Sequence, residues 1–235
     1  MEQLIFELAA PEPQSFANFL PGRNEEAVVM LARLAVGDIA ETGIVLWGGP
    51  GVGKSHLLHA SIGAAADLRP TLLCADCATV PAAPPGPRAL VAVDGVDTAD
   101  ASQQGRLFSL YNALRASGGQ MLAAAAVPPA RMPLRDDVRT RLGWGLVYEI
   151  LPLADGDKPA ALAVYAKSRG VTLPDEVIAY LLAHGRRDMA SLLAALLALD
   201  RFSLAQKRPI TLPLLKEWLQ RNLGLPSAMP ENSHR

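Results

Sequence analysis

The sequence predicts an α/β fold, in which a parallel sheet is covered by helices on both faces and is followed by a small all-α domain. Strand-sized apolar runs alternate with segments of helical spacing, and a glycine-rich turn follows the first run directly. Apolar runs of this kind are typical of strands buried on both faces of a parallel sheet. After about residue 154 only helical patterns remain. The expected strands lie at 44–48, 71–76, 89–94 and 121–127.

The expected helices have recognisable ends. A segment with helical spacing, 105–118, stops at a pair of glycines, and another follows the glycine-rich turn at 56–68. A proline-rich connector at 78–87 leaves no room for a helix, because proline removes a backbone donor and clashes with the preceding turn. Near the C-terminus, glycine stops and a threonine N-cap delimit four helices. These helices are expected within 157–170, 174–185, 188–207 and 211–224.

Composition excludes several classes of protein. The 235 residues carry a formal net charge of −1, with 50% hydrophobic and 19% charged residues. This balance argues against a strong intrinsic grip on nucleic acid, which normally needs a basic face. The apolar runs are too short or too interrupted to span a membrane, and residues 1–13 lack the features of a secretory signal. We therefore expect a cytoplasmic protein.

The glycine-rich turn matches the phosphate-binding loop G-x-x-x-x-G-K-[ST] at every required position. Its glycines let successive backbone N–H groups converge on phosphate oxygens, and the following helix directs its positive dipole end at the anion. Lys54 would reach the β- and γ-phosphates, while Ser55 would supply a hydroxyl ligand to Mg²⁺. The motif predicts that ADP or ATP is bound by Gly48, Gly49, Pro50, Gly51, Val52, Gly53, Lys54, Ser55 and the adjacent His56.

A carboxylate for the same Mg²⁺ is expected at the end of a neighbouring strand. The run 89–93 ends in Asp94, which we predict to share the metal with Ser55 through the nucleotide. ATPases of this type usually carry a second acidic residue directly after that aspartate, to orient the attacking water. Gly95 occupies this position, and Asp97 comes two residues later. The sequence therefore predicts nucleotide binding with little intrinsic hydrolysis.

The two cysteines form a C-x-x-C pair, Cys74 and Cys77, at the end of an apolar run. A structural zinc site needs two further ligands, and the histidines show no matching spacing. We interpret the pair as two structural thiols.

Several segments together resemble the DnaA family of AAA+ proteins, and within it the Hda group of regulatory inactivators of DnaA. The segments are 15–28, the loop-and-helix run 46–60, the segment 140–153 and the helical C-terminal part. The resemblance covers about residues 3–220 and implies an AAA+ P-loop NTPase fold with a helical lid. The expected parts are a clamp-binding tail (1–12), an AAA+ α/β nucleotide-binding domain (13–153), a lid domain (154–222) and a flexible tail (223–235).

The first residues are similar to short Q-L-x-L-x-L peptides that dock on the sliding clamp of DNA polymerase. A glutamine anchor and alternating apolar side chains would enter an apolar pocket on the clamp. The same alternation would also suit a short edge strand. The resemblance implies clamp binding through Gln3, Leu4, Phe6 and Leu8.

Two arginines match family motifs by position. Arg141 resembles the arginine finger, which acts on a nucleotide held by the neighbouring subunit, and Arg139 is a nearby competitor for this role. A surface arginine paired with Asp136, Asp137 or another nearby carboxylate is the alternative. Arg187 resembles the lid's sensor arginine, with Arg186 beside it, and either could instead be a solvated charge at a helix start. The run of alanines at 123–126 replaces the polar sensor that the family carries there.

The leading hypothesis is a negative regulator of replication initiation. It would bind ADP or ATP, attach to the DNA-loaded clamp (the β subunit) and stimulate hydrolysis of DnaA-bound ATP in trans. Contact with DNA would be indirect, through the clamp, and self-assembly into a homo-oligomer stays open. A self-sufficient motor such as a helicase loader, a small-molecule P-loop kinase and a clamp adaptor for other cargo are the alternatives.

Overall fold

The computed structural model describes residues 13–185 and 188–223 and divides the chain into two compact units. The first unit ends at Ala154 and the second begins at Asp155. Among the described residues, no helix has both the length and the apolar character needed to cross a bilayer.

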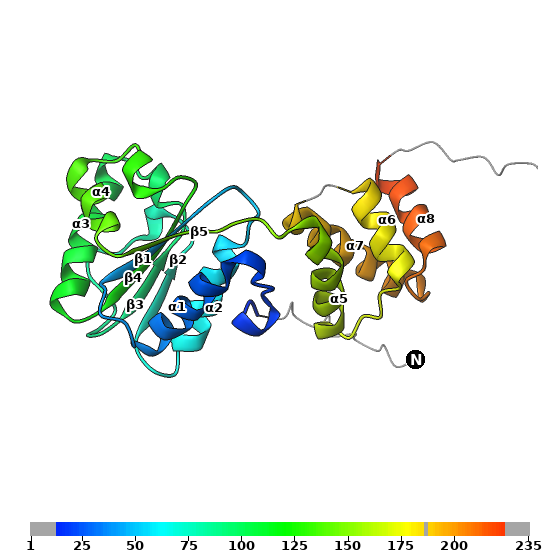
Figure 1. Cartoon of the computed structure of the whole chain (residues 1–235), viewed down its shortest axis with the longest axis horizontal. Helices are drawn as coiled ribbons and strands as arrows, with labels where there is room; N and C mark the ends of the chain where they lie inside the picture. The colour runs from blue at the N-terminus through cyan, green and yellow to red at the C-terminus, as the bar shows by residue number, and fades with distance from the viewer. Residues whose placement is uncertain (1–12, 186–187, 224–235) are drawn as a thin grey trace, which may run out of the picture. The chain divides into compact units, whose positions relative to one another are not determined.

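A five-stranded, wholly parallel sheet forms the centre of the first unit (Figure 1). The order across the sheet is β2-β3-β4-β1-β5. The four predicted strands are present, and a fifth strand that the sequence did not reveal pairs with β1 at the edge. The strands are β1 (Gly43–Trp47), β2 (Thr71–Cys74), β3 (Leu90–Val93), β4 (Gln120–Ala125) and β5 (Leu146–Glu149).

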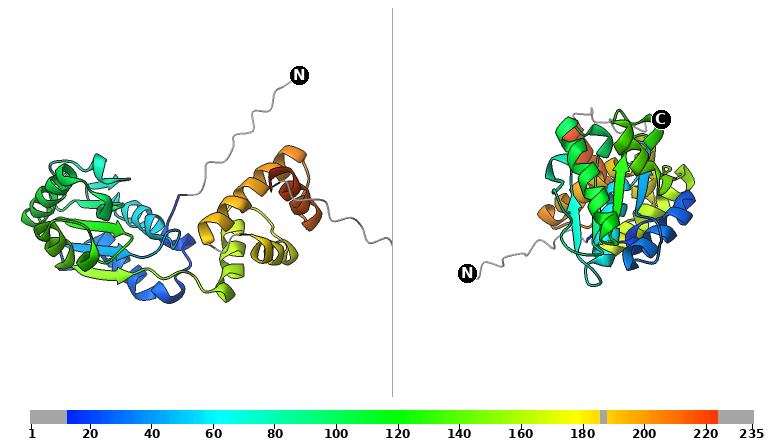
Figure 2. Two further views of the ribbon diagram at one scale, coloured as in Figure 1. Left: turned by 90° about the horizontal axis from the view of Figure 1, so that it is seen from above. Right: turned by 90° about the vertical axis from the view of Figure 1, so that its left-hand side faces the viewer.

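Four helices cover the two faces of the sheet, as Figures 1 and 2 show. Alternate residues of the central strands point to opposite faces of the sheet, so each strand contributes side chains to two hydrophobic cores. Leu122 and Ala124 of β4 pack with α1 and α2, whereas Met121 and Ala123 pack with α3 and α4. Every residue of β4 is buried, as expected for a central parallel strand. The helices are α1 (Glu25–Val36), α2 (Lys54–Ala65), α3 (Ala101–Ala116) and α4 (Asp136–Gly143).

Local signals explain where α3 begins and ends. The Asp100 side chain accepts a hydrogen bond from Gln103 N, and the Gln103 side chain accepts one from Asp100 N, which forms a capping box. The helix stops just before Gly118, whose φ of 69° lies in the left-handed region. Between β2 and β3, only the single 3₁₀ turn Cys77–Thr79 breaks the irregular proline-rich connector. The connector therefore carries no α-helix, as predicted.

A close backbone approach fixes the entry to the edge strand. A Cβ atom added to Gly145 would lie 1.9 Å from Gly43 O and 2.8 Å from Gly43 C. These atoms belong to the backbone at the start of β1, which cannot yield as a flexible side chain would. Glycine at 145 therefore lets the chain leave α4 and pair at once with β1, from Ile44 onward.

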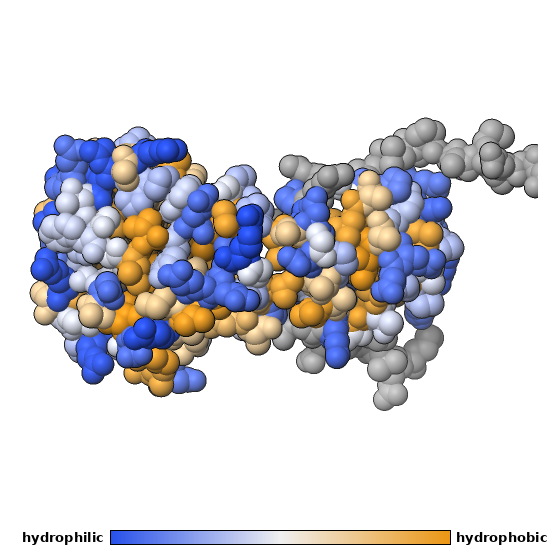
Figure 3. Space-filling model, viewed as in Figure 1, coloured by the Kyte–Doolittle hydropathy of each residue, from blue (hydrophilic) through white to orange (hydrophobic). Residues whose placement is uncertain are grey.

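Within residues 155–185 and 188–223, the second unit contains helices and no strand, as predicted. Its core is formed by leucines and other apolar residues from all four helices, among them Leu162, Ile178, Leu196 and Leu215. On the face drawn in Figure 3, hydrophobic and hydrophilic residues are interspersed on each unit. The helices are α5 (Lys158–Ser168), α6 (Asp175–His184), α7 (Met189–Gln206) and α8 (Leu212–Leu223).

Candidate nucleotide site and arginine finger

The predicted phosphate loop connects the C-terminal end of β1 to the first residues of α2. Gly48, Gly51 and Gly53 have φ values of 152°, 73° and 103°, a run of conformations that side chains other than glycine rarely adopt. Within the described part of the chain, no side chain caps the start of α2. The amide groups at this helix start are therefore free to meet an anion.

Lys54 curls back over the loop that precedes it. Its Nζ donates to Gly48 O at 2.7 Å and to Gly49 O at 2.8 Å. Partial burial lowers the pKa of Lys54, while the charges of Asp94 and Asp97 act in the opposite direction. A phosphate group placed in the loop would add negative charge beside the ammonium group and favour its charged form.

The side chains of Ser55 and Asp94 are in contact, although the strands that precede them, β1 and β3, are not neighbours in the sheet. Ser55 Oγ, at the start of α2, donates to Asp94 Oδ2 at a distance of 2.5 Å. Asp94 follows β3, which is separated from β1 by β4. A hydroxyl and a carboxylate that converge beside a phosphate loop fit the oxygen ligands preferred by Mg²⁺. No group of three or more His, Cys, Asp or Glu side chains suited to a metal occurs among the described residues, so the nucleotide phosphates would complete the set.

In the turn after Asp94, the position directly after the aspartate is a glycine. Gly95 has a φ of 64°, a left-handed conformation in which an L-residue is strained. Asp97, the next acidic residue, accepts a hydrogen bond from Ala126 N at 3.1 Å. Its side chain thus ties the turn to the backbone that follows β4.

An entry segment, residues 15–24 before α1, packs against the phosphate loop, and the sequence patterns did not indicate this contact. His56 Nε2 lies 2.9 Å from Ser15 O, and its ring lies 5.3 Å from that of Phe19. A Cβ atom on Gly53 would approach the Phe19 ring to 2.7 Å. The imidazole of His56 therefore contacts the entry segment. Its predicted contact with the nucleotide remains a prediction.

Further along this segment, the buried side chain of Asn24 exchanges two hydrogen bonds with Leu151. Leu151 N donates to Oδ1 at 2.8 Å, and Nδ2 donates to Leu151 O at 3.0 Å. The pair fastens the start of α1 to the chain that follows β5. No local sequence pattern predicts this contact, because the two residues are 127 positions apart.

We expect the stability of the protein to fall below neutral pH partly through His56. Burial lowers the pKa of His56, although its hydrogen bond to Ser15 O opposes the shift. The unfolded chain then takes up a proton at this residue before the folded chain does, so the contribution is complete above about pH 6.5 and is lost as the pH falls through the lower, folded pKa. Urea unfolding of the unaltered chain and His56→Gln between about pH 5 and 8 tests this. Identical pH dependence in the two proteins would contradict it.

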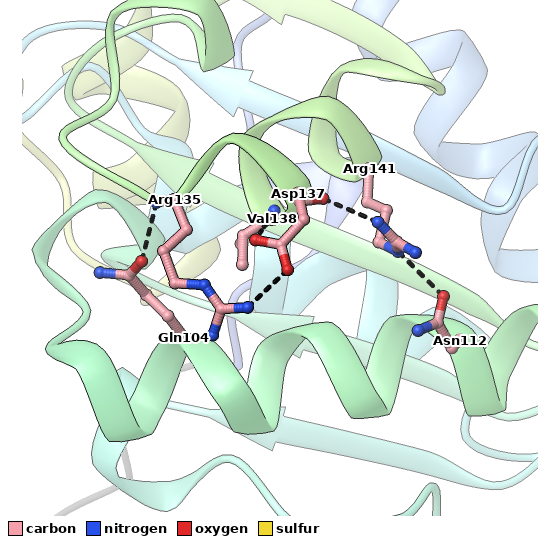
Figure 4. Close-up of polar contacts among 6 residues, drawn as sticks. All are labelled: Gln104, Asn112, Arg135, Asp137, Val138 and Arg141. Atoms are coloured by element: carbon pink, nitrogen blue, oxygen red, sulfur yellow. Dashed lines mark hydrogen bonds and ion pairs between the residues drawn. The ribbon is translucent and has the colours of Figure 1, made fainter.

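Arg141 lies on α4 and is held against α3 (Figure 4). Its Nε donates to Asn112 Oδ1 at 3.0 Å, and its Nη1 donates to Asp137 O at 3.0 Å. The guanidinium carbon lies 3.8 Å from the centre of the Phe108 ring, and the exposed Trp144 ring is 5.5 Å away. In the described part of the chain, no carboxylate lies within ion-pair distance of Arg141. The suggested pairing with Asp136 or Asp137 is therefore absent.

The neighbouring arginines differ in this respect. Arg139 forms an ion pair with Asp136, and Arg135 forms one with Asp137 at 2.6 Å. The charge of Arg141 is thus the one on α4 that a carboxylate of the described residues does not balance. This distinguishes Arg141 from Arg139, its competitor by sequence.

Other predicted residues stand as follows. Gln3, Leu4, Phe6, Leu8, Arg186 and Arg187 lie outside the described residues. Cys74 and Cys77 are buried free thiols whose sulfurs donate to Thr79 O and Gly95 O, and burial raises the pKa of Cys77 to about 11. A thiol in such surroundings stays protonated and unreactive, in line with a structural interpretation.

Comparison with known proteins places both units. Residues 155–219 match the family described as the lid domain of Hda. The chain is similar in structure to domain III of the replication initiation protein DnaA from Thermotoga maritima, with a TM-score of 0.74 and 19% identity over 88% of this chain and 96% of that one. It is similar to AMPPCP-bound DnaA from Aquifex aeolicus, with a TM-score of 0.69 and 17% identity over 90% and 70% of the two chains. A third similar structure is the RuvB Holliday junction branch migration motor of Thermotoga maritima, with a TM-score of 0.66, 13% identity and coverages of 89% and 72%. At such identities the likeness establishes the fold.

Proposed function

We propose that the chain is a DnaA-related AAA+ regulator that acts on DnaA-bound ATP, because residues 155–219 match the family described as the lid domain of Hda and the fold resembles that of DnaA domain III. In this proposal the chain binds ADP or ATP with Mg²⁺ at its own phosphate loop. It attaches through Gln3–Leu8 to the sliding clamp on DNA and offers Arg141 to the nucleotide of DnaA. The result is a DnaA molecule in its ADP form, which restrains initiation.

Nucleotide binding is supported by the loop geometry and by the AMPPCP-bound DnaA structures that the fold resembles. Lys54 would exchange its two carbonyl partners for phosphate oxygens, and the Ser55–Asp94 pair would receive the metal. The Gly95 conformation and the engagement of Asp97 with Ala126 N support weak hydrolysis by the chain itself. Binding without turnover suits a regulator better than a motor.

The observation that carries the proposal is the unbalanced charge of Arg141. Its contacts are with Asn112, Asp137, Phe108 and Trp144 on or next to α3 and α4. None is with Gly48–Ser55 or with Asp94, so the arginine does not serve the nucleotide of its own chain in this arrangement. An arginine offered from outside stabilises charge on the transferring phosphoryl group.

Hydrolysis of ATP bound to purified DnaA tests the proposal. The assay compares DnaA alone with DnaA plus the chain, each with and without clamp loaded on DNA. We expect stimulation only when the chain and the loaded clamp are both present. A variant with alanine at Gln3, Leu4, Phe6 and Leu8 should lose this stimulation and should no longer bind the clamp.

Two results would favour other functions. ATP turnover by the chain alone, comparable with that of a motor, would indicate a self-sufficient ATPase such as a helicase loader. Clamp binding without any effect on DnaA would indicate an adaptor for other cargo.

A further inference from the structure

Gln104 is a buried amide whose two polar groups are both engaged. It lies on α3 and is 8% exposed. Its Nε2 donates to Ala99 O at 2.8 Å. Its Oε1 accepts from Arg135 N at 2.9 Å, the bond drawn in Figure 4. One side chain therefore bridges two segments that are far apart in the sequence.

The first of these segments is the turn that follows the predicted metal ligand. Ala99 ends the 3₁₀ turn Val96–Thr98, which begins right after Asp94 and Gly95. Asp97 of the same turn accepts from Ala126 N, so the turn is anchored on both sides. The hydrogen bond to Ala99 O thus connects Gln104 to an anchored turn beside the candidate nucleotide site.

The second segment is the start of the helix that carries Arg141. Arg135 is the residue before α4, and its own side chain does not cap that helix. Gln104 Oε1 satisfies the Arg135 N–H instead, while the Arg135 side chain pairs with the carboxylate of Asp137. The carbonyl oxygen of Asp137 in turn accepts from Arg141 Nη1. Because α4 is only 8 residues long, the place where it starts determines the place of Arg141.

We propose that Gln104 is a positioning residue for the arginine finger: it fixes the start of α4, and through α4 the guanidinium of Arg141, relative to the turn that follows Asp94. The inference rests on the proposed function, since it assigns a role to a residue that acts through Arg141. It adds that finger activity depends on a buried amide that contacts neither nucleotide nor partner. A misplacement of about 1 Å costs a catalytic group about 100-fold in rate.

The test measures DnaA ATP hydrolysis against the concentration of each variant, with clamp loaded on DNA. Gln104→Met keeps the length of the side chain and removes both hydrogen bonds. We expect its maximal stimulated rate to fall about 100-fold, with the half-saturating concentration unchanged. Gln104→Glu retains an oxygen for Arg135 N but turns its second oxygen toward Ala99 O, so it should keep more of the maximal rate than Gln104→Met and less than the unaltered chain.

Gln103→Met is the matched control, because Gln103 is the adjacent residue of α3 and its side chain caps that helix without touching α4. It should keep the maximal rate. Arg141→Ala, measured in parallel, separates the two claims. If Arg141→Ala still stimulates, the proposed function fails. If Arg141→Ala is inactive and Gln104→Met is fully active, only the role of Gln104 is refuted.

Two further outcomes also overturn the inference. A raised half-saturating concentration with an unchanged maximal rate would make Gln104 part of the binding surface. Loss of folding in both Gln104 variants, seen by circular dichroism and thermal melting, would reduce it to a structural amide.

Discussion

Alanine at Arg141 is expected to lower the stimulated hydrolysis of DnaA-bound ATP by about 1,000-fold, to the level of DnaA alone. In the proposed function the guanidinium would supply positive charge to the transferring phosphoryl group, and in the described part of the chain no carboxylate forms an ion pair with it. Binding of the chain to nucleotide and to clamp should persist, because Arg141 contacts neither the phosphate loop nor Asp94. Single-turnover hydrolysis of labelled ATP on DnaA measures the loss.

Two matched variants make this result specific. Arg139→Ala removes an arginine two residues away that is paired with Asp136, and it should retain most of the stimulation. Arg141→Lys keeps the charge but loses the planar fork that rests on Phe108 and reaches Asn112, so it should recover little. Equal losses in Arg139→Ala and Arg141→Ala would refute the assignment of the finger. Because Arg141 also packs on α3, its removal could destabilise the protein. Thermal melting of each variant tests whether it is still folded.

The second large effect is expected on stability, from Gly145→Ala. The added Cβ would lie 1.9 Å from the carbonyl oxygen of Gly43. The two strands β1 and β5 must therefore move apart at the point where their pairing begins. Overpacking against backbone is costly, and we expect the free energy of unfolding to fall by about 3 kcal/mol or more. Urea denaturation followed by circular dichroism measures the change.

Gly63→Ala is the control with the opposite sign. Gly63 lies in α2 and is exposed, and nothing approaches within 4 Å of the place of a new Cβ. Alanine there should stabilise the protein by about 0.5–1 kcal/mol, because it restricts the unfolded chain. A loss of stability of similar size in both variants would show that the close approach at Gly145 has no special cost.

The sheet was largely predictable because its central strands are apolar on both faces. β1, β3 and β4 read as unbroken apolar runs, and each occurs within two residues of its expected place. β5 was missed because it lies at the sheet edge, where its residues alternate between half-buried and exposed. Its position depends on Gly145 and Gly43, a contact between residues about 100 positions apart that no local pattern encodes.

The candidate site was predictable to the extent that chemistry demands fixed spacing. The phosphate loop follows from one motif, and Asp94 follows from its place at a strand end. Contacts made across the sequence gave no such signal: the packing of Phe19 on Gly53, the bond from His56 to Ser15 O and the bridge made by Gln104 each join separate segments. A buried glutamine in a helix has no pattern that separates it from an exposed one.

The order of strands across the sheet also sets the timing of folding. β1 lies between β4 and β5, so neither of its hydrogen-bonded neighbours exists until the ribosome has made residues 120–125 and then 146–149. During synthesis the apolar run Ile44–Trp47 therefore stays unpaired until β4 and β5 have been made. After dilution from denaturant it must find partners that are distant in the sequence. Proteins with such non-local parallel strand pairing fold slowly, and their unpaired apolar strands are prone to aggregate in the meantime. A nascent chain that pauses before β4 therefore exposes the apolar strand β1, and a chaperone would be needed most at that stage.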